Sequence, residues 1–259
     1  MSFIPFLFVG FLNDMISSSC YTKTKEKDGY NMAHILMSRG IIDKPHIKSK
    51  IEPYIKPNMK VCFLALSYFN DQFKDQKTYE DFYSEGGEYY EKIVQQFSIY
   101  GIQSSNISWI LDSKDDQKSA VKKIKEADIL YFPGGAPDRF MERIINLGIK
   151  DVIEAHLGHF IGSSAGTMIQ FKNYYISKDN EYKKFTYEEG LDLLSGFFVE
   201  THYRRRVQQK NGMRKVYRAY HEPIFGLPDD GLIIVDKDEI ELIYPADIIY
   251  GNQGIYYRK

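Results

Sequence analysis

Short apolar runs alternate with longer amphipathic stretches through the first two thirds of the chain. The runs that predict β-strands are 3–9, 61–66, 107–111, 128–132 and 159–162. The stretches that predict helices are 29–39, 79–100, 116–126 and 138–156. Continuous apolar strands separated by helices are typical of a mostly parallel sheet with helices on both faces. The fold class expected from this pattern is therefore α/β.

After residue 162 the spacing of apolar runs becomes shorter, which predicts additional strands at the edge of the sheet, some of them antiparallel. These runs are 196–200, 224–228, 231–236, 239–243, 247–250 and 254–257. Two polar segments interrupt them. Residues 172–189 are predicted to be a long loop, and residues 203–222 a loop or a helical excursion.

The chain has 259 residues, 43% of them hydrophobic, which suits a single α/β domain over 1–259. Residues 13–58 are rich in Lys, Ser and Pro and are interpreted as an insertion or connection with one or two helices. The apolar start, residues 3–12, follows no Lys or Arg and is too short to cross a bilayer. It is interpreted as a buried strand, and no membrane partner is expected.

The charge is balanced, with 34 basic and 35 acidic residues, so nothing indicates a nucleic-acid partner. Cys62 lies in an apolar run and Cys20 follows three serines, a placement that favours a reducing, cytoplasmic location over a disulfide scaffold. The sequence contains no C-x-x-C or H-E-x-x-H pattern, so neither a metal nor another cofactor is expected.

The strongest chemical signal is a G-x-S-x-G motif, which places Ser164 between Gly162 and Gly166 directly after the apolar run that ends at residue 162. In a strand–turn–helix context this motif exposes the central serine at a sharp turn. The motif also occurs by chance, but the strand before it and Met168 and Ile169 after it supply that context. Ser164 is therefore the candidate nucleophile.

A serine nucleophile needs a base and a group that orients the base. Of the six histidines, His202 is best placed, because it follows the apolar run 196–200 and so falls just past a strand end. His221 is the reserve. Asp229 and Asp230 lie in a turn between two apolar runs, and either could orient the histidine. A Pro-Asp-Asp-Gly sequence is also an ordinary turn.

Two further features surround this candidate triad. Gly134 and Gly135 follow a predicted strand and allow backbone N–H groups to approach a substrate, as an oxyanion hole requires. Arg204, Arg205 and Arg206 follow His202 directly and could select a substrate carboxylate. A solvated basic loop is an equally good reading of these arginines.

Three segments together resemble the dipeptidase E and cyanophycinase family of serine peptidases over about residues 60–257. The segments are Ala127-Asp-Ile-Leu-Tyr-Phe-Pro-Gly-Gly135, Phe160-Ile-Gly-Ser-Ser-Ala-Gly166, and Gly190-Leu-Asp-Leu-Leu194 followed by His202-Tyr203. The resemblance implies a flavodoxin-like fold similar to that of class I glutamine amidotransferases, with serine at the elbow where those enzymes have cysteine.

By position, the resemblance makes Ser164 the nucleophile and His202 the base, with Asp229 preferred over Asp230 as the acid. It places oxyanion N–H groups at Gly135 and Ala165. It also places Glu200 near the substrate. The chain departs from the family at Ala136-Pro137, where many relatives carry a polar residue that binds substrate.

The expected function is that of a serine hydrolase that cleaves a short peptide through an acyl-enzyme. The alternatives are a non-catalytic small-molecule binding protein on the same fold, and an amidase or esterase that uses the same triad. Fold analogy alone does not decide among them. A homodimer is left open.

Overall fold

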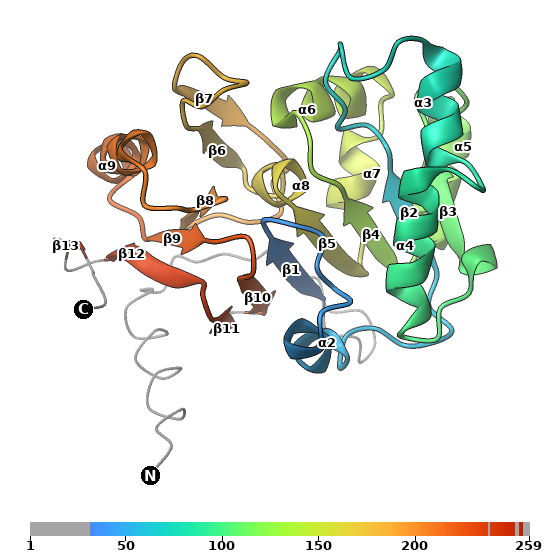
Figure 1. The fold of residues 1–259 in the computed structure, drawn as a ribbon, viewed down its shortest axis with the longest axis horizontal. Helices are drawn as coiled ribbons and strands as arrows, with labels where there is room; N and C mark the ends of the chain where they lie inside the picture. Colours follow the sequence, from blue (N-terminus) through green and yellow to red (C-terminus); the bar gives the residue numbers. More distant parts are fainter. Residues whose placement is uncertain (1–31, 238, 252–253, 256–259) are drawn as a thin grey trace.

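The computed structural model describes residues 32–237, 239–251 and 254–255. The strand predicted at 3–9 and the end of the run 254–257 lie outside the described residues. Figure 1 shows a central sheet with helices on both sides and a smaller strand-rich part at one end. This arrangement is the mostly parallel α/β architecture expected from the sequence.

A seven-stranded sheet, in the order β11-β10-β1-β5-β4-β2-β3, forms the centre of the described chain. The strands from β1 to β3 in this order pair in parallel, whereas β10 and β11 pair antiparallel at one edge. The strands are β1 (Ala33–Met37), β2 (Val61–Leu64), β3 (Ile107–Ile110), β4 (Ile129–Phe132), β5 (His159–Ser163), β10 (Leu232–Asp236) and β11 (Glu239–Ile243).

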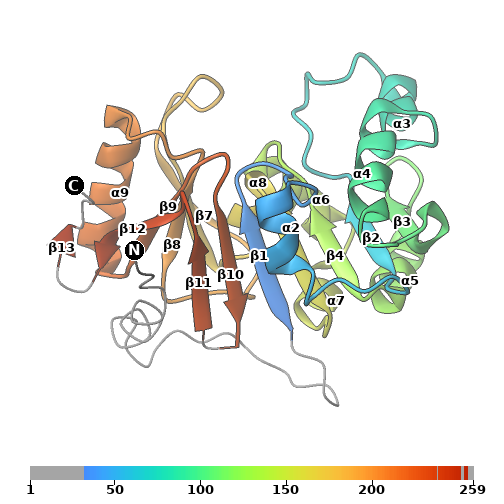
Figure 2. The ribbon, with the colours of Figure 1, turned by 60° about the horizontal axis from the view of Figure 1, so that its bottom comes forward.

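Helices cover both faces of this sheet because its strands are apolar on both sides (Figure 2). Phe63 and Leu64 are neighbours in β2, and they point into two different buried clusters. One cluster includes residues of α2 (Pro45–Ile51), α3 (Gln76–Tyr83) and α4 (Glu88–Ser98). The other includes residues of α5 (Gln117–Glu126), α6 (Pro137–Asn146) and α7 (Lys150–Glu154).

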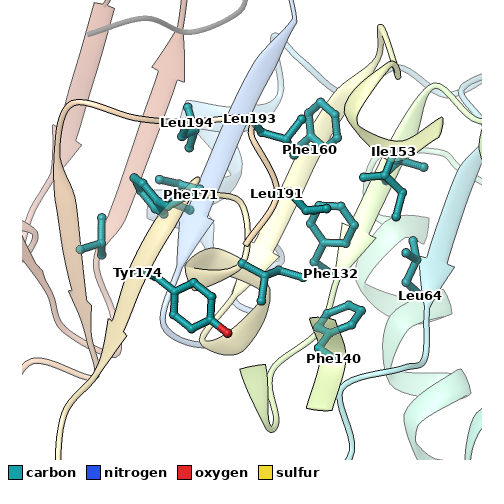
Figure 3. Close-up of a cluster of buried hydrophobic side chains, with 14 of the residues drawn as sticks. Leu64, Phe132, Phe140, Ile153, Phe160, Phe171, Tyr174, Leu191, Leu193 and Leu194 are labelled. Atoms are coloured by element: carbon teal, nitrogen blue, oxygen red, sulfur yellow. The ribbon is translucent and has the colours of Figure 1, made fainter. Parts of the chain in front are cut away.

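The cluster on the α6 side is drawn in Figure 3. Leu64, Phe132 and Phe160 from three neighbouring strands meet Phe140 of α6 and Ile153 of α7, and all five are fully buried. Burying one such side chain stabilises a fold by roughly 1.5–3 kcal/mol. This face of the sheet is therefore a rigid support for the strand ends at which the candidate site lies.

A second sheet, with the order β13-β12-β9-β8, lies beside the central one. Helix α9 (Val207–Tyr220) packs on it through Met213 and Val216. The remaining elements are β6 (Asn173–Ile176), β7 (Thr186–Glu189), β8 (Phe198–Thr201), β9 (Ile224–Leu227), β12 (Asp247–Gly251), β13 (Gly254–Ile255), α8 (Ala165–Met168) and a 3₁₀ turn at Ser104–Asn106.

The helix predicted at 29–39 is wrong, because residues 33–37 form β1, a central strand. Every residue of β1 is buried, so its pattern shows neither the alternation of a half-exposed strand nor a polar helix face. His34 also weakened the strand pattern, because a polar residue type interrupts the apolar segment. In the structure its ring stacks on Phe160, and burial lowers its pKa to about 4, so it is neutral at physiological pH.

Two other predicted helices are each divided at a glycine, a predicted loop contains two strands, and the predicted loop or helical excursion contains a helix. The helix predicted at 79–100 is interrupted at Gly86, where φ is +84°, and becomes α3 and α4. The helix predicted at 138–156 is interrupted at Gly148, with φ +67°, and becomes α6 and α7. The loop predicted at 172–189 contains β6 and β7, which pair antiparallel. The excursion predicted at 203–222 contains α9.

Candidate active site

Ser164 stands at a sharp turn between β5 and α8. Its backbone has φ 49° and ψ −112°, a combination that residues with a side chain rarely adopt. The turn is tight on its inner side. A Cβ on Gly166 would lie 1.9 Å from the carbonyl oxygen of Phe132, and a Cβ on Gly162 would lie 2.4 Å from the carbonyl oxygen of Gly166. Only glycine fits at these two motif positions.

The turn is also held from β1. The N–H of Ser164 donates to the carbonyl oxygen of Met37 at 2.9 Å. The Thr167 hydroxyl lies within hydrogen-bond distance of the same carbonyl, at 2.7 Å, and of the Gly162 carbonyl, at 2.9 Å. Thr167 Oγ1 also accepts from the Met37 N–H at 3.1 Å. These contacts fix the strained serine in place from both sides.

His202 lies within hydrogen-bond distance of Ser164. Its Nε2 is 2.9 Å from Ser164 Oγ. The residue follows β8, and its backbone also has a positive φ, 51°. Its N–H donates to Ser38 Oγ at 2.8 Å, and Gln209 Nε2 donates to its carbonyl oxygen at 3.0 Å. The backbone of His202 is therefore held by Ser38, which follows β1, and by Gln209 of the helix at Val207–Tyr220.

Asp229 contacts the other imidazole nitrogen, with Oδ1 2.6 Å from His202 Nδ1. Its Oδ2 accepts from Arg204 at 2.6 Å and forms an ion pair with Arg39 at 3.1 Å. Partial burial by itself would raise the pKa of Asp229. The hydrogen bonds from His202, Arg204 and Arg39 outweigh this effect and hold the pKa well below its usual range. Asp229 is therefore a carboxylate at any physiological pH.

Asp230 is exposed, and the contact that the structure gives it is between its backbone carbonyl oxygen and His46 Nε2, at 3.5 Å. The geometry thus brings Asp229, rather than its neighbour, to the histidine. His221, the reserve histidine, ends α9, where its ring lies against Tyr217.

The paired glycines follow β4 and pass close to Ser164. A Cβ on Gly134 would lie 3.2 Å from the Cβ of Ser164. Gly135 has φ +148°, and a Cβ there would lie 2.0 Å from the carbonyl oxygen of Ser67. Ser67 fixes this loop, because its hydroxyl donates to the Gly134 carbonyl at 2.7 Å and its carbonyl accepts from Ala136 N–H at 2.6 Å.

Ala165 is the first residue of α8, so its N–H has no acceptor inside that helix. The Gly135 loop and the start of α8 therefore flank the serine hydroxyl. Backbone N–H groups in this position can stabilise negative charge that develops on a substrate oxygen.

A cavity of about 640 Å³ opens beside Ser164, His202 and Gly135. We refer to it as the mixed-charge cavity, because its lining carries both acids and bases: Lys178, Asp179, Glu181, Glu200, Arg204 and Arg206. Of the three consecutive arginines, Arg204 and Arg206 line the cavity. Arg205 is exposed outside its lining. The guanidinium of Arg204 is already bound to Asp229.

Glu200 is the most buried charged side chain of the mixed-charge cavity, at 5% exposure. It lies on β8, and its Oε2 accepts from Ser177 Oγ at 2.9 Å. Burial raises the pKa of Glu200 to about 7, although hydrogen bonds, among them that from Ser177, favour the charged form. Glu200 therefore exchanges a proton near neutral pH within a cavity that also contains the serine.

Two contacts of the site were not foreseen in the sequence. Ser38 supports the backbone of His202, and Arg39 pairs with Asp229. Both residues follow β1, so the mistaken helix at 29–39 concealed them. A recognised strand there would have pointed to them, because residues that follow the parallel strands gather at one edge of the sheet.

Among the described residues, no three His, Cys, Asp or Glu side chains are grouped as metal ligands would be. None of the described helices has the length and apolar character that crossing a membrane requires.

The fold and the serine at the elbow define the class of the protein, a serine hydrolase of the flavodoxin-like α/β type. The chain belongs to peptidase family S51, the dipeptidase E family, whose model matches residues 67–243, and it is a serine-type peptidase. Among curated proteins, none matches the sequence.

Two solved structures are similar to the fold. One is a candidate peptidase E protein from Listeria monocytogenes EGD-e, with a TM-score of 0.58 and 18% identity, covering 83% of this chain and 98% of its own. The other is a peptidase from an acI-B1 Actinobacterium, with a TM-score of 0.60 and 14% identity, covering 88% of this chain and 97% of its own.

Proposed function

We propose that the protein hydrolyses a short peptide with Ser164 as nucleophile, His202 as general base and Asp229 as the orienting acid. The observation that carries the proposal is the continuous chain of contacts from Ser164 Oγ to His202 Nε2 at 2.9 Å and from His202 Nδ1 to Asp229 Oδ1 at 2.6 Å. Nucleophile, base and orienting acid in this order are the parts that acyl transfer by serine requires.

In the proposed mechanism, Ser164 Oγ attacks the scissile carbonyl carbon while its proton passes to His202 Nε2. The carboxylate of Asp229 stabilises the imidazolium, and the N–H groups of Gly135 and Ala165 bind the oxyanion. His202 then gives its proton to the leaving amine as the C–N bond breaks. A water molecule, deprotonated by His202, releases the acyl group and restores the serine.

The test of the nucleophile compares two adjacent serines. Ser164→Ala should reduce kcat/KM for a cleaved peptide on the order of 10³-fold or more and abolish labelling by a fluorophosphonate. Ser163→Ala is the matched control, because Ser163 is the buried last residue of β5, and its loss should be much milder. Near-normal hydrolysis by Ser164→Ala would contradict the proposal.

The same labelling experiment separates the alternatives. A non-catalytic binding protein, which the Ala136-Pro137 departure favours slightly, would leave the fluorophosphonate unreacted. An amidase or esterase would be labelled but would hydrolyse simple amides or esters in preference to peptides. The contacts of His202 with both Ser164 and Asp229 favour a reactive serine.

We further propose that the acyl residue of the substrate carries a carboxylate, which Arg206, with Arg204, selects in the mixed-charge cavity. An Asp-containing dipeptide should be cleaved faster than its Asn counterpart, and Arg206→Ala should remove the difference. Arg205→Ala is the control, because Arg205 lies outside the lining. Equal rates on both peptides, unchanged by substitution of each of the three arginines, would exclude this specificity. The cytoplasmic location and the homodimer stay predictions.

A further inference from the structure

A second cavity, of about 490 Å³, meets the first at the nucleophile. Both cavities include Gly135, Ser164 and His202 in their linings, so the serine hydroxyl stands where they join. We refer to the second one as the cationic cavity. Its other walls come from the segment after β1, with Arg39 and Lys44, and from α4, with Tyr89, Lys92 and Gln96.

The lining of the cationic cavity has more basic than acidic side chains. Lys44 and Lys92 are exposed, and the structure gives neither an ion pair with a described residue. The Lys92 ammonium lies 5.4 Å from the centre of the Tyr89 ring, which holds it at the cavity. Asp43 is the one carboxylate of the lining, and its Oδ1 accepts from Gln96 Nε2 at 2.9 Å. Arg39 is shared with Asp229.

The two cavities therefore differ in the groups they suit. The mixed-charge cavity offers carboxylates and cations together, which suits an amino-terminal residue with an α-ammonium and an acidic side chain. The cationic cavity offers two ammonium groups with no ion-pair partner among the described residues, which suits a group that is only negative. A peptide whose carbonyl carbon lies at Ser164 must extend into both.

We propose that Lys44 and Lys92 bind the free C-terminal carboxylate of the substrate, so that the leaving amino acid occupies the cationic cavity. This inference rests on the proposed peptidase function. Lys44 precedes the segment 67–243 that matches the family model, whereas Lys92 lies within it.

The experiment measures binding separately from hydrolysis. Asp-Leu and its C-terminal amide, Asp-Leu-NH₂, are titrated into the Ser164→Ala variant by calorimetry. Amidation removes the negative charge without shortening the peptide. The free acid should bind on the order of 10-fold more tightly than the amide, because charge-assisted hydrogen bonds are the strong ones.

In the Ser164→Ala background, the added pair Lys44→Met and Lys92→Met should bring this ratio close to one. Lys125→Met is the matched control, because Lys125 is an exposed lysine at the end of α5 that lines neither cavity, and it should leave the ratio unchanged. Circular dichroism confirms that each variant is folded.

Equal affinity for the acid and the amide, a preference that survives the double substitution, or no binding of either peptide would overturn the inference. Hydrolysis of Asp-Leu by the unmodified enzyme is scored separately. A lysine-dependent preference without hydrolysis would contradict the peptidase proposal and leave the carboxylate site standing. Hydrolysis of Asp-Leu without a lysine-dependent preference would support the peptidase proposal and overturn the carboxylate site.

Discussion

Ser164 is strained, and the strain is compensated by residues distant in sequence. A residue in a sparsely populated region of φ and ψ costs of order 1–3 kcal/mol and persists only where its surroundings fix it. At Ser164 the carbonyl oxygen of Met37, 127 positions earlier, accepts the serine N–H at 2.9 Å. The strand that orders Ser164 is thus β1, which lies outside the 67–243 segment that matches the family model.

The proposed orienting acid can be tested by comparing two neighbours, because Asp229 and Asp230 are adjacent and only Asp229 contacts His202. Asp229→Asn should keep the shape but lose the charge that stabilises the imidazolium, and kcat should fall on the order of 10³- to 10⁴-fold. Asp230→Asn should change kcat by less than about two-fold. Steady-state kinetics on one cleaved peptide measures both, and a larger loss at Asp230 would refute the assignment.

Glu200 predicts how stability depends on pH. Its pKa is raised to about 7 from 4.5, so the folded chain holds a proton that the unfolded chain releases between these values. The stability that this group contributes is fully present below pH 4.5. It is lost as the pH rises through 7, and the loss in the free energy of unfolding is roughly 3 kcal/mol. Glu200→Gln should therefore stabilise the protein at pH 8 far more than at pH 5.

Urea unfolding at the two pH values measures this difference. Glu181→Gln is the control, because Glu181 lines the same cavity but is exposed, and its replacement should affect both pH values about equally. The same gain from Glu200→Gln at pH 5 and pH 8 would show that Glu200 is ionised in the folded chain throughout.

At the scale of elements, α8 can follow β5 only because Gly166 lets it approach β4. A Cβ at this position would meet a backbone oxygen, that of Phe132, at 1.9 Å, and backbone cannot rotate away as a side chain can. Gly166→Ala should displace α8, lower the free energy of unfolding by about 1–3 kcal/mol and abolish activity.

Gly86→Ala is the matched control for Gly166→Ala. Gly86 has φ +84° and open space around it, so alanine there adds backbone strain without a collision. It should cost about 1–2 kcal/mol and leave activity intact. Thermal unfolding and kinetics of both variants test the distinction. Retained activity in Gly166→Ala would show that α8 tolerates the shift.

The elements that the sequence predicted correctly are those whose signal is local. The apolar runs of β2, β3, β4 and β5 and the elbow at Ser164 carry their own pattern, and each appears in the structure. β1 failed because its five residues include a buried histidine, His34, so the segment lacks the uninterrupted apolar run that marked β2 and β4. β6 and β7 failed because each is only four residues long, β7 has polar and exposed positions, and neither segment alone indicates that the two strands pair.

The residues of the candidate site can be separated in the same way, into those with a local signal in the sequence and those without one. Ser164 and Gly135 were recognisable from motifs, and His202 from its place after a strand. The choice of Asp229 over Asp230 depended on resemblance, since both stand in one turn. Arg39 and Lys44 were not foreseen, because the helix predicted at 29–39 concealed β1, and it is the pairing of β1 with β5 that brings the segment after β1 to the serine. Such long-range placement is a property of the topology.

At the scale of the whole molecule, β1 joins two halves. It pairs in parallel with β5 on one side and antiparallel with β10 on the other, and so connects the parallel sheet to the antiparallel edge. Its side chains also alternate between the two buried clusters, with Ile35 in one and Leu36 in the other. Both faces and both halves of the central sheet therefore depend on one strand of five residues.

This arrangement predicts a single cooperative transition that a change in β1 shifts as a whole. Leu36 is fully buried, so Leu36→Ala should lower the free energy of unfolding by about 2–5 kcal/mol through lost burial and a cavity. Trp109 is the chain's one tryptophan and lies in β3, at the opposite edge of the sheet from β11. Its fluorescence should shift to lower urea concentration together with the circular dichroism signal.

Ile145→Ala is the control for this experiment, because Ile145 is a hydrophobic residue of α6 that is 58% exposed, and its loss should change stability by less than about 0.5 kcal/mol. If Leu36→Ala moved the circular dichroism transition but left the Trp109 transition in place, the β2–β3 part would unfold independently of β1. The turn at Ser164 would then depend on only the nearer half of the sheet, because its support comes from β1, β4 and β5.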